Sequence, residues 1–212
     1  MQDAFLKAMN VGERPCALII GIEGDPATTS FVGVRARALF KLAGGVAVGA
    51  SPARRWFAGR FHGPYSRDPL MDRGLGVDTL ETATSWSNVM RLWTAVRDAL
   101  DKAMRANARE PGAHGIVLGH VSHTYHDGAS LYFTYIYPRD LSREVEQWQA
   151  IKKAASDAIA ANGGTISHHH GVGEDHVAWL AGEKGAIGME VLRAIKHALD
   201  PKGVMNPGKL LP

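Results

Sequence analysis

Cysteine is nearly absent from this sequence, since only Cys16 occurs among 212 residues. A single cysteine excludes a disulfide framework within the chain and suits a reducing compartment. It also excludes a metal site built on paired cysteines. Cys16 opens an apolar run over residues 16–23, which predicts a buried strand.

Long apolar stretches are missing as well. No segment approaches the roughly 20 apolar residues that a membrane-spanning helix needs. Residues 1–15 lack the apolar core of a signal peptide. We therefore expect a cytoplasmic protein without a transmembrane segment.

A continuous basic stripe is the third absence. The net charge is +3, from 24 Lys and Arg against 21 Asp and Glu, and several arginines cluster only loosely within residues 54–73. The predicted helices mix charges of both signs. This pattern disfavours a track for nucleic acid, so we expect no nucleic-acid partner, and it favours a local anion site.

Apolar periodicity predicts an α+β fold. The order strand, helix, strand, strand, helix, strand over residues 77–168 is that of a ferredoxin-like split βαβ unit. An Asp-Gly turn at 127–128 favours a hairpin between the second and third strands. The expected strands cover 77–85, 115–125, 129–137 and 165–167, with helices that begin at Ser87 and near Leu141. The result is a ferredoxin-like antiparallel sheet with helices on one face.

The flanking segments extend this unit. Upstream we expect strands at 16–23 and 46–49 around a helix capped by Asp25, with Pro26 at its first position. Residues 54–76 read as a short helix and a long loop. Two further helical stretches and an irregular tail follow. The predicted domains are therefore a ferredoxin-like substrate or cap domain over 1–173 and a C-terminal helical extension over 174–212.

Three consecutive histidines, His168, His169 and His170, precede a Gly-Val-Gly turn at 171–173. Imidazoles titrate near neutral pH and bind metals, so the run indicates proton transfer or metal ligation. Alternation along an extended segment would place His168 and His170 on one face and His169 on the other. The alternatives are a hydrogen-bonded surface strand end or a tag, and the internal position disfavours a tag.

A second polar group lies in the predicted strand before the hairpin turn. Alternation separates two sets of side chains, the first being His120, Ser122, Thr124 and His126 and the second His123 and Tyr125. Tyr125, beside the turn, is a candidate proton donor or acceptor. The alternative is that Tyr125 and Tyr132 only pack across the strands, which their spacing alone favours.

Arg67 is the candidate for anion binding. A guanidinium in a structured loop suits bidentate recognition of a carboxylate or phosphate. The equally plausible alternative is a surface ion pair with Asp68 or Asp72. No glycine-rich phosphate loop is present, because Gly171 and Gly173 precede acidic residues.

A metal site would need His168 and His170 with His120 or His123 as a third ligand. No established metal-ligand spacing supports that set. We therefore expect no metal.

Several blocks resemble the C-terminal half of FAD-linked oxidases of the vanillyl-alcohol-oxidase type. Within that family they are most similar to alkyldihydroxyacetonephosphate synthase-like proteins. The end of the chain, 199–209, resembles that of glycolate oxidase and D-lactate dehydrogenase subunits. The blocks that carry the resemblance are Pro64-Tyr65-Ser66-Arg67-Asp68, Asp78-Thr79-Leu80-Glu81-Thr82-Ala83 with Trp86, 120–133 and 166–173.

The resemblance implies a role for each candidate residue. Tyr125 would be the acid–base group, assisted by His170 and His168, and Arg67 would hold the anionic head of the substrate. His169, His120 and His123 would line the substrate cavity, and Asn206 would face the cofactor. Related metal-dependent dehydrogenases carry Glu-His where this sequence has His169-His170, together with a Gly-Asp-Gly-Asn block that is missing here. That departure favours the synthase-like branch.

The resemblance also implies FAD as the cofactor, bound mainly by an N-terminal domain that this chain lacks. We therefore expect an FAD domain in cis, leave a homodimer open, and expect the isolated chain to be inactive. In one version an acyl group is exchanged for an alkoxy group without net redox change. In another, a 2-hydroxy acid such as lactate or glycolate is dehydrogenated. The alternative of another class is a stand-alone ferredoxin-like ligand-binding module.

Overall fold

The computed structural model describes residues 17–211, in two units that meet between Ser66 and Arg67. The first unit contains three elements, α2 (Pro26–Leu42), α3 (Ser51–Gly59) and the 3-10 helix η1 (Gly63–Ser66). The second contains the sheet. Within residues 17–211 no helix has the length and apolar character of a membrane span.

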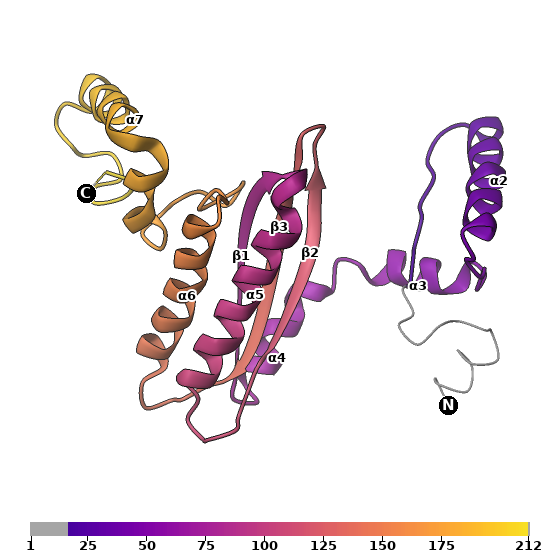
Figure 1. The fold of residues 1–212 in the computed structure, drawn as a ribbon, viewed down its shortest axis with the longest axis horizontal. Helices are drawn as coiled ribbons and strands as arrows, with labels where there is room; N and C mark the ends of the chain where they lie inside the picture. Colours follow the sequence, from indigo (N-terminus) through magenta and orange to yellow (C-terminus); the bar gives the residue numbers. More distant parts are fainter. Residues whose placement is uncertain (1–16, 212) are drawn as a thin grey trace. The chain divides into compact units, whose positions relative to one another are not determined.

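The second unit is an α+β layer, which confirms the predicted fold class (Figure 1). Its strands pair antiparallel in the order β1-β3-β2. Its elements in chain order are α4 (Arg67–Met71), β1 (Leu75–Ser85), η2 (Trp86–Asn88), α5 (Val89–Ala106), β2 (Ile116–Thr124), β3 (Gly128–Pro138), α6 (Glu144–Ala161) and α7 (Val177–Leu199).

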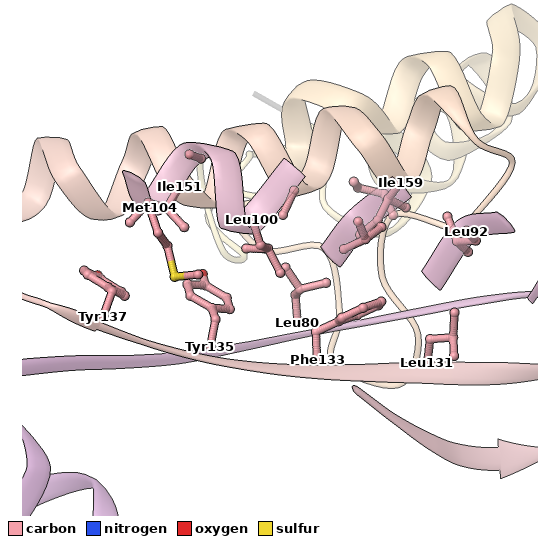
Figure 2. Packing of buried hydrophobic residues seen from close by; sticks show 14 of the residues in the cluster. Leu80, Leu92, Leu100, Met104, Leu131, Phe133, Tyr135, Tyr137, Ile151 and Ile159 are labelled. Atoms are coloured by element: carbon pink, nitrogen blue, oxygen red, sulfur yellow. The ribbon is translucent and has the colours of Figure 1, made fainter. Parts of the chain in front are cut away.

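The core lies between the sheet and the pair α5 and α6 (Figure 2). Alternate residues of the central strand β3 point to these helices and pack against an apolar stripe of α5, whose residues recur at helical spacing. Fully buried members of this layer are Phe133, Tyr135, Leu92, Leu100 and Ile151. We call the opposite face of the sheet the outer face.

Helices of the second unit follow their predicted periodicity closely. α5 buries Val89, Leu92, Val96, Leu100 and Met104, which recur at helical spacing, although Ser87 lies in η2 and does not cap the helix. In α6 the stripe is partly polar, because Gln147 and Lys152 are buried and bonded. α7 is interrupted at Gly185, where φ is 68°, so two helical stretches follow each other as expected.

The predicted last strand at 165–167 does not form. Thr165 N donates to Ala83 O at 3.0 Å, beside β1, but the next amide, Ile166 N, donates to the carboxylate of Glu183 at 2.6 Å. The amide of Ile166 is therefore bonded to the side chain of Glu183, from α7, and does not pair with a strand. The segment occupies the edge position of a fourth strand without being one.

The first unit differs more from its sequence pattern. Asp25 caps α2 through its carboxylate, with Pro26 in the first turn, as predicted. The strands expected at 16–23 and 46–49 are wrong, because residues 17–23 and 46–49 are not in strands. Leu18 is 68% exposed. An extended apolar segment needs a partner strand, and no strand occurs in residues 17–66. Cys16 lies outside the described residues.

Candidate functional site

A β-bulge in β2 decides which side chains reach the outer face. Val121 pairs with Leu131 and Thr124 with Ala129, so three steps along β2 match two along β3. The extra residue reverses the alternation. His120, in register with Tyr132, therefore shares the outer face with the side chains that follow the bulge at 123 and 125. The predicted separation of His120 from Tyr125 is wrong for this reason.

The turn after the bulge holds the backbone of Tyr125 while leaving its side chain accessible. Tyr125 N donates to Gly128 O at 2.8 Å, and Trp86 Nε1 donates to Tyr125 O at 3.0 Å. Gly128 is needed here, because a Cβ at that position would lie 2.2 Å from Thr84 O. The Tyr125 side chain is 44% exposed. A fixed backbone and an accessible hydroxyl suit a reactive residue.

The histidine run forms a loop across the outer face. Its path is set by the Glu183 bond at its start and by Ser167 Oγ, which donates to Gly171 O at 2.6 Å. His169 has φ 59°, a left-handed conformation that costs a non-glycine residue free energy. This turn stacks the rings of His168 and His169, with centroids 3.9 Å apart.

These rings meet Tyr125. The hydroxyl of Tyr125 lies 3.0 Å from Nε2 of His168 and 3.5 Å from Nε2 of His169. His123 adds a third ring, edge-on to His169 at 4.8 Å between centroids. Four predicted site residues from two distant segments are thus brought together.

His170 turns away from this group. Its ring lies edge-on to Tyr132, 5.4 Å between centroids, and its Nε2 lies 3.2 Å from Glu81. Among the described residues, Tyr125 makes no hydrogen bond to His170. His120 lies in the same cross-strand row as Tyr132 and Glu81.

Glu81 is the site residue that the sequence reading missed. It is 5% exposed, and its Oε1 lies 3.4 Å from Nδ1 of His168. That contact is too poorly aligned to count as a hydrogen bond, so Glu81 Oε1 and His168 Nδ1 are both buried without a partner among the described residues. A glutamate in the middle of a predicted strand was the available signal, since glutamate is almost never fully buried unless paired.

A cavity of about 480 Å³ opens beside β1, next to His170 and Glu81. The C-terminal tail reaches it because the carboxylate of Asp200 accepts Val204 N and Met205 N, at 3.0 and 2.9 Å. Asn206, with φ 49°, therefore lines the cavity.

His176 also lines this cavity. Burial and, next, the charge of Lys152 lower the pKa of His176, which favours its neutral form.

Arg67 makes no hydrogen bond to the histidines among the described residues. It opens α4 and is exposed, and no ion pair or hydrogen bond of its side chain occurs within residues 17–211. The alternative pairs with Asp68 and Asp72 therefore do not form there. In the same part of the chain, no three His, Cys, Asp or Glu residues are arranged to hold a metal.

Comparisons with known proteins agree with this architecture. A family model described as "FAD linked oxidases, C-terminal domain" matches residues 2–210. The alkyldihydroxyacetonephosphate synthase of Dictyostelium discoideum is 32% identical over 197 residues, which are 93% of this chain and 32% of that protein. A probable mitochondrial D-lactate dehydrogenase of Danio rerio is 33% identical over 97 residues, 46% of this chain and 18% of that protein.

A solved structure of an alkyldihydroxyacetonephosphate synthase superposes with a TM-score of 0.59 at 26% identity. The match covers 88% of this chain and 30% of that one. The chain thus spans about a third of the length of the synthases that it matches.

Proposed function

The chain belongs to the family of C-terminal domains of FAD linked oxidases, and from that premise we propose that it is the substrate-facing part of a flavoenzyme. The proposed reaction is of the alkyldihydroxyacetonephosphate synthase type, on a small anionic substrate. The observation that carries the proposal is the Tyr125 hydroxyl, 3.0 Å from His168 Nε2 on an accessible surface.

The residues on the outer face fit the reactive end of a flavin. A planar ring system that faces a substrate needs nearby groups that can give and take protons. This surface offers the hydroxyl of Tyr125, within 3.5 Å of two imidazole nitrogens. Bound FAD would supply the ring that accepts electrons or activates the substrate. Tyr125 and His169 would face that ring and the substrate, and Asn206 is our candidate for a contact from the tail.

Tyr125 is the proposed acid–base group. Its hydroxyl can pass a proton to Nε2 of His168 and then take one from a substrate hydroxyl, because both steps need only a lone pair at a fixed distance. His169 offers a second acceptor at 3.5 Å and restricts the rotation of the phenol. Positioned acid–base catalysis of this kind contributes about 10²–10⁴-fold to rate.

The anionic end of the substrate is assigned to Arg67. A guanidinium without a partner in the described residues keeps its planar set of donors for a phosphate or carboxylate. His120 and His123 would line the substrate cavity, since both lie on the outer face.

The test is Tyr125→Phe in the FAD-loaded enzyme, assayed for alkoxy-for-acyl exchange with a phosphorylated acyl ester and a long-chain alcohol. We expect turnover to fall about 10²–10⁴-fold. Tyr132→Phe is the matched control, because Tyr132 lies on the same face without a hydrogen bond from its hydroxyl to the histidines among the described residues. Full activity of Tyr125→Phe would remove the phenol from the mechanism.

A second candidate reaction is dehydrogenation of a 2-hydroxy acid, favoured by the similarity to the D-lactate dehydrogenase. The same enzyme should then reduce an acceptor dye with D-lactate or glycolate and show no exchange. A Tyr125-dependent rate with one substrate pair only would decide between the two.

A further inference from the structure

Glu81 places a buried carboxylate beneath the histidine loop. It lies on the outer face of β1, in register with Tyr132 of β3, and the loop at 168–170 covers it. Its two oxygens face different rings, Oε1 toward His168 at 3.4 Å and Oε2 toward His170 at 3.2 Å. A buried carboxylate is costly unless cationic or N–H groups surround it.

The two nitrogens of His168 have different neighbours. Nδ1 faces Glu81, whereas Nε2 faces the hydroxyl of Tyr125 at 3.0 Å. In a neutral imidazole one nitrogen carries the proton and the other accepts, and the partner of one nitrogen selects the tautomer. A carboxylate only accepts, so it favours a proton on Nδ1.

We propose that Glu81 is the positioning residue of this site: it holds His168 with Nδ1 protonated, so that Nε2 is free to accept the proton of Tyr125. The second contact, to His170, fixes the carboxylate from its other side. Without Glu81 the proton could sit on Nε2, which would then donate toward Tyr125 and could not take its proton.

The proton transfer balances within these three side chains. The O–H bond of Tyr125 breaks, an N–H bond forms at Nε2 of His168, and the proton on Nδ1 stays in place. His168 then carries a positive charge opposite the ionised Glu81, and the phenolate is ready to accept a substrate proton. The present contact of Nδ1 with Oε1 is long, and the charged ring would shorten it. This role in turnover rests on the proposed function, whereas the tautomer does not.

The tautomer is measured on the 212-residue chain itself, by long-range ¹H–¹⁵N correlation spectra of the histidine rings. We expect His168 to show a protonated Nδ1 and an unprotonated Nε2 in the wild type. Glu81→Gln keeps an acceptor oxygen and should keep that tautomer. Glu81→Leu removes the acceptor and should move the proton to Nε2. The control Asp140→Asn alters another buried carboxylate, near the far end of β3, and should leave the His168 signals unchanged.

Thermal unfolding verifies that each variant is folded, and Glu81→Ala replaces Glu81→Leu if the leucine does not fold. A wild-type His168 with its proton on Nε2, or one whose tautomer is the same in Glu81→Leu or Glu81→Ala, would overturn the proposal.

Turnover separates orientation from charge. In the FAD-loaded enzyme, Glu81→Gln keeps the acceptor that orients His168 but removes the negative charge opposite the protonated ring, so kcat should fall with a much smaller change in KM. Glu81→Leu should lower it further. If the tautomer responds as expected while Tyr125→Phe remains active, the proposed function fails and the positioning of His168 stands. If Tyr125→Phe is inactive and the tautomer of His168 does not change in the Glu81 variants, the proposed function stands and the positioning of His168 by Glu81 fails.

Discussion

Two tyrosines of one hairpin show how the two faces of the sheet differ. Tyr135 points to α5 and α6, is fully buried, and donates to Asp78 at 2.6 Å. Burial and, next, the charge of Asp78 raise the pKa of Tyr135, so its proton is held firmly. Tyr125 is accessible, and its hydroxyl lies within 3.5 Å of two imidazole nitrogens. A tyrosine hydroxyl thus stabilises the fold on the covered face, whereas a tyrosine hydroxyl on the outer face is available for chemistry.

Each face of the sheet holds a carboxylate, Asp78 on the covered face and Glu81 on the outer face, and the two differ in how many hydrogen bonds they accept. Asp78 is saturated, since Trp148 Nε1 donates to it at 2.7 Å and Lys152 Nζ lies 3.1 Å away. Neither oxygen of Glu81 accepts a hydrogen bond among the described residues, and Oε1 is fully buried. A saturated network specifies structure, whereas an unsaturated one keeps capacity for a change of protonation.

The largest expected effect comes from Asp78→Leu. It removes the acceptor of Tyr135 and Trp148 and leaves the ammonium of Lys152 buried without its ion pair. Breaking a buried pair from one side costs about 3–5 kcal/mol, which urea unfolding would show. The exposed control Asp98→Asn should cost at most about 0.5 kcal/mol. Equal effects of the two would deny that the covered face is held by this network.

The contribution of Asp78 should also depend on pH. Burial would raise the pKa of Asp78, but the charge of Lys152 and hydrogen bonds from Tyr135 and Trp148 lower it below 3.8. A carboxylate with a depressed pKa stabilises the fold fully above its unfolded value and loses that effect as the pH falls through the folded value. The gap in unfolding free energy between wild type and Asp78→Leu should therefore be constant above about pH 5 and shrink below that.

The tyrosines test the comparison directly. Tyr135→Phe removes a hydrogen bond to a charged acceptor and should destabilise the chain by about 1.5–3 kcal/mol. Tyr125→Phe should change stability by at most about 0.5 kcal/mol, because its hydroxyl is accessible to water. Paired urea curves measure both, and a larger loss for Tyr125→Phe would reverse the assignment of the two faces.

Gly128 lies where the hairpin turn packs against β1, and its carbonyl holds the backbone of Tyr125. In Gly128→Ala the new Cβ would lie 2.2 Å from Thr84 O, a backbone atom, so the turn must move. Forcing an extra methyl group into a packed site costs about 1–3 kcal/mol. The displacement should also separate Tyr125 from His168, visible as shifted ring signals. Gly59→Ala, at a position with open space, is the control.

The fold of the second unit could be predicted because its helices and strands bury regular stripes. Leu92, Leu100 and Phe133 recur at the spacing of their elements, and that spacing is a property of the chain alone. The first unit misled the reading, since the run at 17–23 has the composition of a buried strand but no partner strand in residues 17–66. Whether an apolar segment is buried depends on the element that packs against it, and the composition of the segment does not show that element.

The residue types of the candidate site could be named from the sequence, but their arrangement could not. Tyr125 and the histidine run were identified because their side chains carry distinctive chemistry. The bulge after Val121 was not, and one unpaired residue there reversed the face of every side chain that follows. Glu81 was given no role because its partners His168 and His170 are more than 80 positions away, and only its charge inside a predicted strand marked it.

Arg67 should have the smallest effect on stability and still matter for the substrate. Its side chain is exposed and has no partner within residues 17–211, so Arg67→Lys and Arg67→Ala should change the unfolding free energy by at most about 0.5 kcal/mol. If Arg67 binds the anionic head of the substrate, lysine keeps the charge but loses the planar fork, and affinity should fall by about 1–3 kcal/mol. KM in the FAD-loaded enzyme measures this, with Arg109→Lys as an exposed control. Unchanged kinetics in both Arg67 variants would leave the outer face without its proposed anion contact and confine the site to Tyr125 and the histidines.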